Sequence, residues 1–388
     1  MPKPLLETIL PPAPKTGRWH ALLRWFDTSV EAPLDHRADR IDWLRTLPFI
    51  ALHLACFAVF WVGVSWFAVT VAVVLYAVRM FALTGFYHRY FSHKAFRTSR
   101  PVQFFFAAIG ATCVQRGPLW WAAHHRHHHR HTDTPADPHS PRQHGFWWSH
   151  MGWFLTPRGF RTNWDAIPDL RKFPELRLLD RYDILMPVLL AVGLYYFGEW
   201  LQQAYPGLET NGPQLLVWGF FVSTIVLFHA TVTINSLAHV FGSRRFDTRD
   251  DSRNNWFLAL ITFGEGWHNN HHHFPGSARQ GFLWWEYDFT WYGVKLMSWV
   301  GRVSDLKPVP AGLSRPARGD AGVASPSSVR ASRAWGRHGC CRAGTRWSCS
   351  RPTITWVDTR TPTTSNCKAR PMRWIRVSSS STMRITHC

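Results

Sequence analysis

The residues of this sequence that are best suited to chemistry are three clusters of histidines. They have the forms His88-x4-His93, His125-x2-His128-His129 and His268-x2-His271-His272. Imidazole is the commonest neutral metal ligand, and a site rich in histidine and poor in cysteine suits iron, copper or zinc. One cluster could arise by chance among 22 histidines. Three clusters that each begin at or just beyond a long apolar run predict one shared metal site.

The spacing within each cluster allows its histidines to converge. Residues three to five apart can lie on one side of a helix or of its terminal turn, so the eight histidines can reach one or two ions. A further pair, Asn235 and His239, closes another apolar run at positions i and i+4, which share a helical face. A ninth imidazole and an amide oxygen, or a water held by it, would complete two coordination shells.

The composition of these clusters narrows the choice of metal. Nine neutral imidazoles without cysteine argue against structural zinc, which is usually four-coordinate with Cys and His ligands. Two ions that share nine nitrogens keep open positions, which suits redox metals that activate oxygen beside an apolar substrate. The alternative is a surface histidine tract that binds metal adventitiously, but recurrence at three distant places argues against it.

The elements that must position the clusters are long apolar segments. A membrane span needs about 20 apolar residues, and four segments approach that length: 48–64, 67–87, 184–201 and 215–234. Two other apolar stretches, 102–114 and 256–263, are too short to cross a bilayer. The sequence therefore predicts an all-α membrane protein with four transmembrane helices in two hairpins. A cytoplasmic helical cap would carry the dimetal site.

Topology supports one shared site. Two crossings separate the first two clusters from the third, so all three would lie on one face of the membrane. The segment 89–181 carries 14 Arg and Lys and the first 46 residues carry seven, whereas the predicted turns 63–66 and 202–214 carry none. The positive-inside rule then places the clusters and both termini of this multi-pass protein in the cytoplasm.

Three regions are predicted along the chain: a cytoplasmic N-terminal segment (1–46), a membrane domain (47–308) and a tail (309–388). The tail lacks hydrophobic periodicity, so we expect it to be disordered or an aberrant C-terminus. Between Pro308 and Cys388 it has 14 Arg and Lys against 2 Asp, which is +12 of the net charge of +20. The basic composition therefore does not predict a nucleic-acid partner. Cys56 and Cys113 lie in apolar stretches and are interpreted as packed thiols.

The motifs resemble those of membrane-bound fatty acyl desaturases of the stearoyl-CoA (delta-9) type. The likeness extends from about Leu47 to Pro308 and includes the three histidine boxes and the runs Gly264-Glu265-Gly266-Trp267-His268-Asn269, Ala136-Asp137-Pro138-His139 and Asn235-Ser236-x-x-His239. By this resemblance Asn235 holds a metal-bound water, and the metal ligands are His88, His93, His125, His128, His129, His239, His268, His271 and His272.

The resemblance also implies a reaction. Two iron ions (Fe2+/Fe3+) and O2 would introduce a cis double bond, expected at position 9, into a saturated acyl chain carried by CoA or a lipid. A separate ferredoxin-, rubredoxin- or cytochrome-type donor would supply electrons, because no Cys-rich carrier domain is fused to the chain. An apolar tunnel would fix which carbons react, with walls expected on the second and fourth spans and around Trp120-Trp121 and Trp147-Trp148.

The sequence departs from the family motifs at two places, and two alternative functions remain open. Ala123-His124 replaces an Arg-Asp pair that holds CoA in animal relatives, and Pro157-Arg158 retains half of a second basic pair. Losing charge-assisted contacts weakens phosphate binding, so the carrier could be a phospholipid instead. One alternative function is a fatty acid or alkane hydroxylase of the same superfamily. The other is a non-catalytic metal-binding membrane protein, which would need ionisable groups within its spans, whereas Arg79 is the only formal charge between Pro48 and Tyr87.

Overall fold

The computed structural model describes residues 18–30 and 38–313, so most of the predicted tail and part of the predicted N-terminal segment lie outside the described residues. One antiparallel strand pair joins β1 (Arg97–Thr98) to β2 (Val303–Ser304). The other regular elements of the described part are helices, in agreement with the predicted all-α fold class. The α-helices are α1 (Arg18–Leu23), α2 (Trp43–Ala55), α3 (Val59–Val62), α4 (Trp66–Phe81), α5 (Arg100–Ala111), α6 (Pro118–His131), α7 (Pro141–His144), α8 (Pro174–Arg181), α9 (Leu185–Ala204), α10 (Gly212–Gln214), α11 (Ser223–Asn235), α12 (Trp256–Ile261), α13 (His268–His273) and α14 (Phe289–Trp299).

Shorter turns of other helix types connect or extend these helices. The 3-10 turns are η2 (Cys56–Ala58), η5 (Trp153–Leu155), η6 (Trp164–Ala166), η7 (Pro206–Leu208) and η9 (Leu237–His239). The π-helical segments are η3 (Ala82–Ser92), η4 (Trp148–Gly152) and η8 (Leu215–Val222). Because π-helical turns are rare and often occur at functional sites, the position of η3 at the first histidine box is informative.

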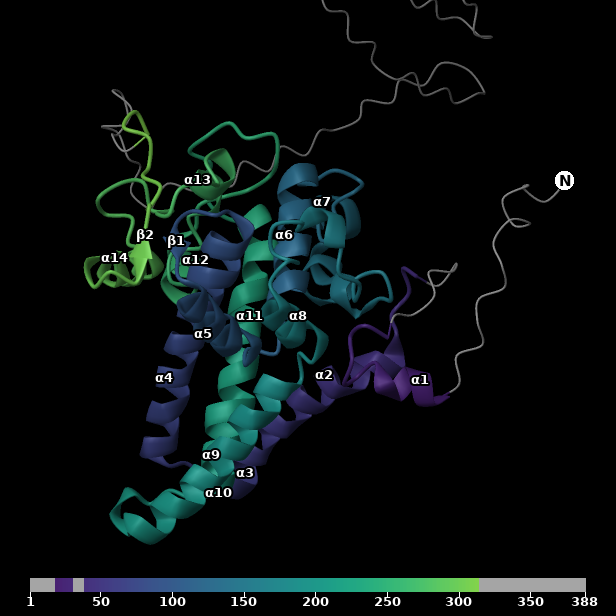
Figure 1. Cartoon of the computed structure of the whole chain (residues 1–388), viewed down its shortest axis with the longest axis vertical. Helices are drawn as coiled ribbons and strands as arrows, with labels where there is room; N and C mark the ends of the chain where they lie inside the picture. The colour runs from purple at the N-terminus through teal and green to yellow at the C-terminus, as the bar shows by residue number, and fades with distance from the viewer. Residues whose placement is uncertain (1–17, 31–37, 314–388) are drawn as a thin grey trace, which may run out of the picture. The chain divides into compact units, whose positions relative to one another are not determined.

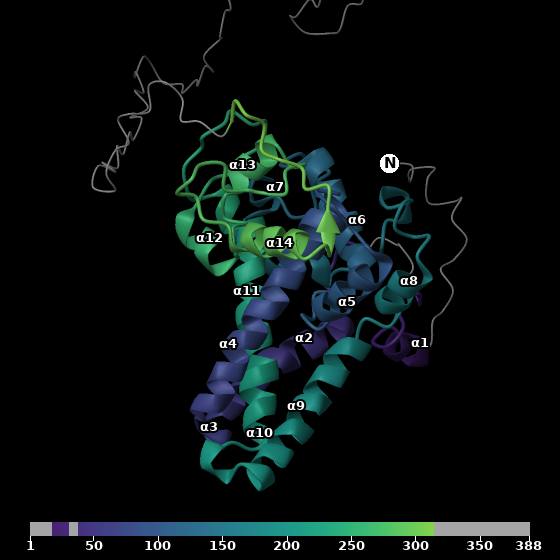
Figure 2. The same ribbon diagram turned by 60° about the vertical axis from the view of Figure 1, so that its left-hand side comes forward.

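Three continuous helical stretches in the described part are long and apolar enough to cross a membrane: Trp43–Val62, Trp66–Ser92 and Gly212–His239. A fourth candidate is the pair α8 and α9, which is bent by 71° at its break. In Figures 1 and 2, α3, α4, α9 and α10 extend away from the end of the fold that carries α12 and α13. The prediction of membrane-spanning helices is thus confirmed, with three or four candidate spans. Their arrangement as two hairpins remains a prediction.

The first two candidate spans are separated by a tight turn. Gly63 ends α3 with φ +70°, a left-handed conformation that glycine adopts without a Cβ penalty. Ser65 then caps α4 by accepting a hydrogen bond from the Ala68 amide. The chain therefore reverses at the place where the apolar pattern predicts a turn.

Arg79 lies inside the second candidate span and faces the protein interior. Its side chain is almost fully buried, with 1% of its surface exposed. The guanidinium donates to Ser223 Oγ at 2.6 Å and to Thr224 Oγ1 at 2.7 Å. These bonds tie α4 to the start of α11, so Arg79 is used here to join two spans and does not reach for the membrane surface.

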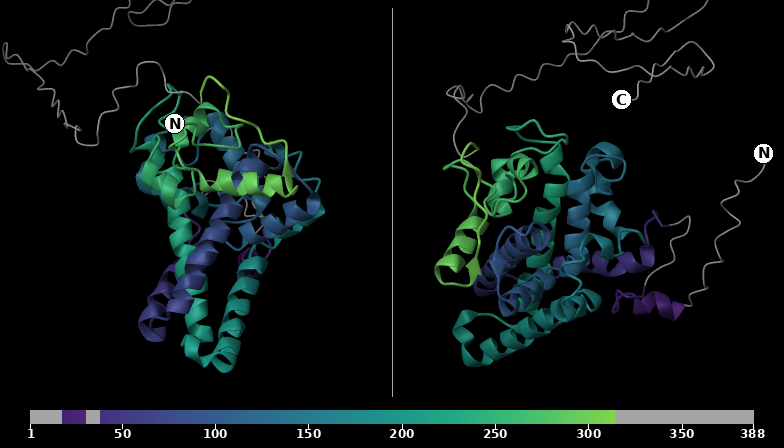
Figure 3. Two further views of the ribbon diagram at one scale, coloured as in Figure 1. Left: turned by 90° about the vertical axis from the view of Figure 1, so that its left-hand side faces the viewer. Right: turned by 45° about the horizontal axis from the view of Figure 1, so that its top comes forward.

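The helices that carry the second and third histidine boxes, α6 and α13, lie at the same end of the described part (Figure 3). Asp180 fixes the start of α6, because its Oδ1 accepts hydrogen bonds from the Leu119 and Trp120 amides at 2.9 and 2.8 Å. The core beneath is apolar and aromatic, and it includes Phe86 and Phe91, which are fully buried. This core holds α5, α6 and η3 in place, and with them two of the three histidine boxes.

Candidate metal centre

The first histidine box lies at the end of a π-helix. In η3 the His93 amide donates to the His88 carbonyl at 3.2 Å, which is an i to i+5 bond. A π-helical turn therefore brings residues five apart onto one face. The two rings meet edge to face with centroids 4.8 Å apart. The His-x4-His spacing is thus matched to the helix type that carries it.

The second and third boxes lie on the α-helices α6 and α13. Neighbouring residues on an α-helix point about 100° apart, whereas residues i and i+4 share a face. His125 and His129 therefore point one way and His128 another. On α13 the order is reversed, because His268 and His272 share a face and His271 points elsewhere. The second and third boxes each consequently contribute to both histidine groups.

The nine predicted histidines form two groups in which all ligand nitrogens lie within 4.8 Å of one another. Several nitrogens face each other directly, as between His88 Nε2 and His271 Nε2 at 3.1 Å and between His93 Nε2 and His125 Nε2 at 2.8 Å. Neighbouring ligands of an ion at about 2.1 Å are roughly 3 Å apart, so these separations fit metal coordination. The five-histidine group is His88, His93, His125, His129 and His271, and the four-histidine group is His128, His239, His268 and His272.

Carboxylates hold four of these rings through their Nδ1 atoms. The partners are Glu265 for His88 at 2.6 Å, Asp137 for His128 at 3.0 Å, Asp133 for His239 at 3.1 Å, and Asp250 for His272 at 2.9 Å. Such a bond fixes the tautomer and leaves the Nε2 lone pair for a metal. One pair belongs to the five-histidine group and three belong to the four-histidine group. The four-histidine group therefore has the more negative surroundings.

The electrostatics of both groups favour the neutral form of several imidazoles. Burial, followed by the charges of neighbouring histidines, lowers the pKa of His93, His125 and His271 well below the usual histidine value. Burial also lowers the pKa of His272 to about 4, although the hydrogen bond to Asp250 opposes it. Metal binding requires the deprotonated ring. These histidines are therefore in the right protonation state at neutral pH.

One orphaned nitrogen also fits a bound ion. His272 Nε2 is buried and has no hydrogen-bond partner among the described residues. An unsatisfied buried polar atom costs free energy, so native structures seldom retain one without a reason. A metal at the four-histidine group would give the His272 Nε2 lone pair a partner.

A buried ion-pair network lies next to the start of the third box. Arg89 is 1% exposed and contacts Glu265 at 3.0 Å and Asp288 at 2.9 Å. Glu265 thus links this arginine to the His88 ring. Gly266 follows it, and a Cβ there would collide with the backbone of α12 at Ala259. The Gly-Glu-Gly-Trp-His run therefore lets the chain pass close to α12 and enter α13 at a fixed angle.

Asn235 is placed differently from the nine histidines. It is the last residue of α11, and His239 lies in the separate turn η9. The α-helix ends between them, although the helical stretch continues through the 3-10 turn to His239, so the expectation that both share one face stays a prediction. Asn235 lines a cavity together with His125, and its role as a holder of metal-bound water remains a prediction.

A third cluster, His128, Asp137 and His139, overlaps the four-histidine group. Asp137 accepts from His128 Nδ1, and its other oxygen lies 3.4 Å from His139 Nδ1. Because the carboxylate is already used to orient His128, we interpret this cluster as support for the four-histidine group. Burial lowers the pKa of His139 to about 3, so this ring is also neutral.

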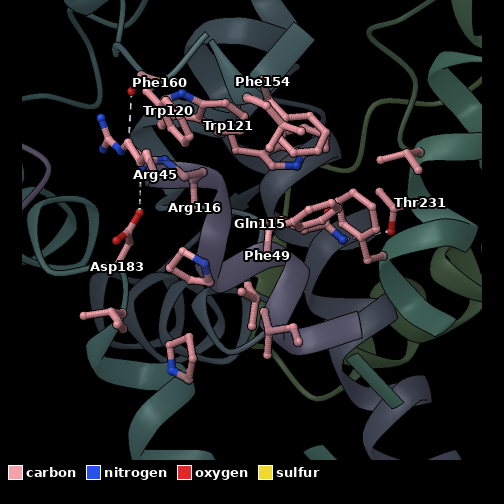
Figure 4. A pocket seen from close by; sticks show the side chains of 18 of the residues that line it. Arg45, Phe49, Gln115, Arg116, Trp120, Trp121, Phe154, Phe160, Asp183 and Thr231 are labelled. Carbon is pink, nitrogen blue, oxygen red and sulfur yellow. Dashed lines mark hydrogen bonds and ion pairs between the residues drawn. The ribbon is translucent and has the colours of Figure 1, made fainter. Parts of the chain in front are cut away.

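A cavity of about 570 Å3 extends from the five-histidine group between α2, α9 and α11. His125 and Asn235 line its metal end, and the remaining walls are mostly apolar or aromatic (Figure 4). Trp120 and Trp121 line it as predicted. No residue of α4 does, and Trp147 is 71% exposed instead. The expected walls on the second span and at Trp147-Trp148 are therefore wrong. The predicted fourth span (215–234) does provide walls, among them Phe220 and Phe228, and α2 and α9 provide others.

The functional residues that the sequence reasoning missed are mainly the carboxylates. Asp133 and Asp250 belong to none of the sequence motifs, although both bind histidine rings of the four-histidine group. Asp250 lies 22 residues from His272 and Asp133 lies 106 residues from His239. The only available signal was the acidic residues close to the second box and in the loop before the third.

Comparisons with known proteins agree with this site. Residues 64–296 match the fatty acid desaturase family. The chain is 37% identical over 299 residues to an acyl-CoA 5-desaturase of Anemone leveillei, covering 72% of this chain and 86% of that protein. It is 37% identical to an sn-1 stearoyl-lipid 9-desaturase of Anabaena variabilis (69% and 94% covered), and 41% identical to a chloroplastic palmitoyl-monogalactosyldiacylglycerol delta-7 desaturase of Arabidopsis thaliana (57% and 57% covered). This chain therefore belongs to the fatty acid desaturase family of membrane oxidoreductases.

Proposed function

We propose that this protein is an O2-dependent fatty acyl desaturase that introduces a cis double bond at position 9 of a saturated chain. The observation that carries the proposal is that His125 belongs to the five-histidine group and also lines the apolar cavity. A chain in that cavity would present its methylene groups to the metal-binding nitrogens. The similar proteins act at positions 5, 7 and 9, so the position rests on the likeness to the delta-9 type.

The metal centre in this proposal consists of two iron ions, one in each histidine group, with Asn235 holding a water. When bound, the ions and O2 supply the chemistry that removes hydrogen from unactivated C–H bonds. The chain's own residues orient the metal ligands and exclude water. Glu265, Asp137, Asp133 and Asp250 fix the ring orientations, and burial keeps the imidazoles neutral and the reacting carbons away from water.

The cavity walls do the positioning. Ala51, Ala55 and Ala191 are small wall residues, and Phe220, Phe221 and Phe228 are large ones. An apolar chain gains free energy in such a channel by leaving water, and a fixed channel shape determines which carbon pair reaches the metals. The substrate proposed here is an acyl chain carried by CoA or by a lipid.

The proposal includes an orientation and an electron source. The basic segments 1–46 and 89–181 favour a cytoplasmic location for the metal site and both termini. The electrons would come from a separate ferredoxin-, rubredoxin- or cytochrome-type protein that approaches from the same side.

Expression in a host that cannot make unsaturated fatty acids tests the function. Gas chromatography with mass spectrometry should show a new monoene with the chain and none without it. Accumulation of a hydroxy acid without a monoene would instead assign a hydroxylase. His128→Ala should abolish the product, whereas His127→Ala on the same helix, whose Nε2 faces the Ala136 carbonyl at 2.9 Å, should retain it.

A further inference from the structure

Three arginines line one side of the cavity, away from its metal end. They are Arg24 after α1, Arg45 in the first turn of α2 and Arg116 just before α6. Figure 4 shows Arg45 and Arg116 on the same side as Asp183 and opposite Thr231. Asp183 is the only carboxylate among the lining residues. This end of the cavity therefore has an excess of positive charge.

The arginines are only partly satisfied by the described residues. Arg116 pairs with Asp183 at 3.2 Å and donates to the Phe160 carbonyl at 3.1 Å. Arg24 is 9% exposed, and its Nε and Nη2 find no acceptor within the described ranges. The same holds for Arg45 Nη2 and Arg116 Nε. A buried charged donor without an acceptor is costly, so these four nitrogens indicate a site for an anionic group.

Two of the guanidinium groups, those of Arg45 and Arg116, stack against aromatic rings. Arg45 lies 4.0 Å and Arg116 lies 5.3 Å from the centroid of Phe160, and Arg116 also lies 5.7 Å from that of Trp120. Stacking restricts these long side chains before any ligand arrives, which reduces the entropy lost on binding. The planar fork of an arginine matches the oxygens of a phosphate in geometry and charge.

We infer that Arg24, Arg45 and Arg116 form a phosphate-binding subsite for the head group of the acyl carrier. This inference rests on the proposed function, because it assumes that an acyl chain fills the rest of the cavity. A phosphodiester or diphosphate would supply both the missing acceptors and the missing negative charge. A neutral sugar head group would leave the charge unbalanced. Glycerophospholipids and acyl-CoA both carry the required chemistry.

Length favours the phospholipid as the source. From Pro118, where α6 begins, to His125 the helix rises about 10 Å at 1.5 Å per residue, and Arg116 lies two residues before that start. Nine carbons in a zigzag of C–C bonds of about 1.5 Å extend roughly 11 Å. With its middle carbons beside His125, an acyl chain would thus bring its ester close to the arginines. A glycerophospholipid carries its phosphate a few bonds beyond that ester, whereas a long pantetheine arm separates the thioester from the phosphates of CoA.

Binding to the purified full-length protein in a neutral detergent tests the subsite without requiring turnover. The probes are radiolabelled dipalmitoyl phosphatidylglycerol, palmitoyl-CoA and dipalmitoyl monogalactosyldiacylglycerol. We expect a phosphate-bearing probe to bind more tightly than the galactolipid, and Arg24→Gln to weaken that binding about tenfold or more. Whichever phosphate-bearing probe responds identifies the carrier. Arg302→Gln, at an exposed arginine outside the cavity lining, should change nothing.

Arg24→Gln is the principal variant. Two nitrogens of the Arg24 side chain have no hydrogen-bond partner among the described residues, so the substitution breaks no bond at these atoms. Arg116→Gln also breaks the pair with Asp183, so Arg116→Lys, which retains the charge, should bind more tightly than Arg116→Gln. Equal binding of the galactolipid, or unchanged phospholipid and CoA binding in Arg24→Gln, would overturn the subsite. Product analysis of the wild type is a separate measurement, so a protein that binds in this way but forms no monoene would refute the proposed function and leave the subsite standing.

Discussion

His272 and Asp250 form a pair in which the Nδ1 atom of the ring lies 2.9 Å from Oδ2 of the carboxylate. The opposite nitrogen, Nε2, is buried and has no hydrogen-bond partner in the described part of the chain. The aspartate therefore fixes the ring with its lone pair directed into the four-histidine group. The same arrangement at His128 and His239 makes this group more anionic in its surroundings than the five-histidine group.

Replacing Asp250 with asparagine should weaken metal binding at the four-histidine group. Partners of this kind typically change metal affinity by about 10- to 100-fold, because they raise the basicity of the ring and hold its orientation. Titration of the metal-free protein with Co2+, followed by absorption spectroscopy, measures this affinity. The control is Asp247→Asn in the same loop, where the side chain is fully exposed. Equal affinities for the two variants would show that Asp250 does not act on the metal.

The metal-free protein should lose stability as the pH falls from about 6.5 to about 4. Burial lowers the pKa of His272 to about 4 in the folded chain, whereas an unfolded histidine titrates near 6.5. Between these values the unfolded state binds more protons, so the free energy of unfolding decreases with decreasing pH. Each such imidazole contributes at most about 1.4 kcal/mol per pH unit.

Urea unfolding at several pH values, followed by circular dichroism, measures this dependence. The carboxylate partners should not obscure it, because their hydrogen bonds with histidine outweigh burial and hold the pKa of Asp133 and Asp250 below the usual aspartate value. A free energy of unfolding that stays constant or rises from pH 6.5 to 4 would contradict the neutral, buried state of the histidines.

Asp288→Asn should destabilise the fold strongly. Asp288 is fully buried beside Arg89 at 2.9 Å, and it also accepts hydrogen bonds from the Gln280 and Trp291 amides. Removing one partner of a buried ion pair costs about 3–5 kcal/mol, and Glu265 would remain as the single carboxylate beside Arg89. The control, Arg97→Gln, breaks an exposed pair with Asp305 and should cost about 0–1 kcal/mol. Thermal unfolding of both variants tests the contrast, and similar losses would exclude a special role for the buried network.

Ala191→Phe should change which acyl chains are used. Ala191 lines the cavity on α9, so a phenyl ring there would occupy space that a long chain needs. The ratio of hexadecenoic to octadecenoic product, measured by gas chromatography, should shift toward the shorter chain. Val192→Phe is the matched control, because Val192 is adjacent, 47% exposed and outside the lining. The same product ratio in both variants would show that the acyl chain does not occupy this cavity.

The sequence allowed the nine histidines to be predicted because their short-range spacing reflects helix geometry. His125 and His129 are one α-helical turn apart, and His88 and His93 are one π-helical turn apart. The apolar segments likewise predicted membrane helices, because length and hydrophobicity are local properties. The division of the histidines into groups of five and four also depends on how α6 and α13 face each other, which tertiary packing determines.

Other features could not be predicted from local patterns. The acidic partners come from loops far away in the chain, as with Asp133 and His239. The cavity walls depend on which spans pack around it, so the expected contribution of the second span was wrong. The three basic cavity residues are separated along the sequence, and only folding brings Arg24, Arg45 and Arg116 to one cavity.

The central claim is that nine histidines bind two metal ions. Anaerobic titration of the metal-free, folded full-length protein with Fe2+, followed by counting bound iron per chain, tests it most directly. The account predicts two bound ions for the wild type and for His273→Gln, a neighbouring exposed histidine outside both groups. His271→Gln should impair the five-histidine group and leave one tightly bound ion. A single ion in the wild type, or two tightly bound ions in His271→Gln, would contradict the account.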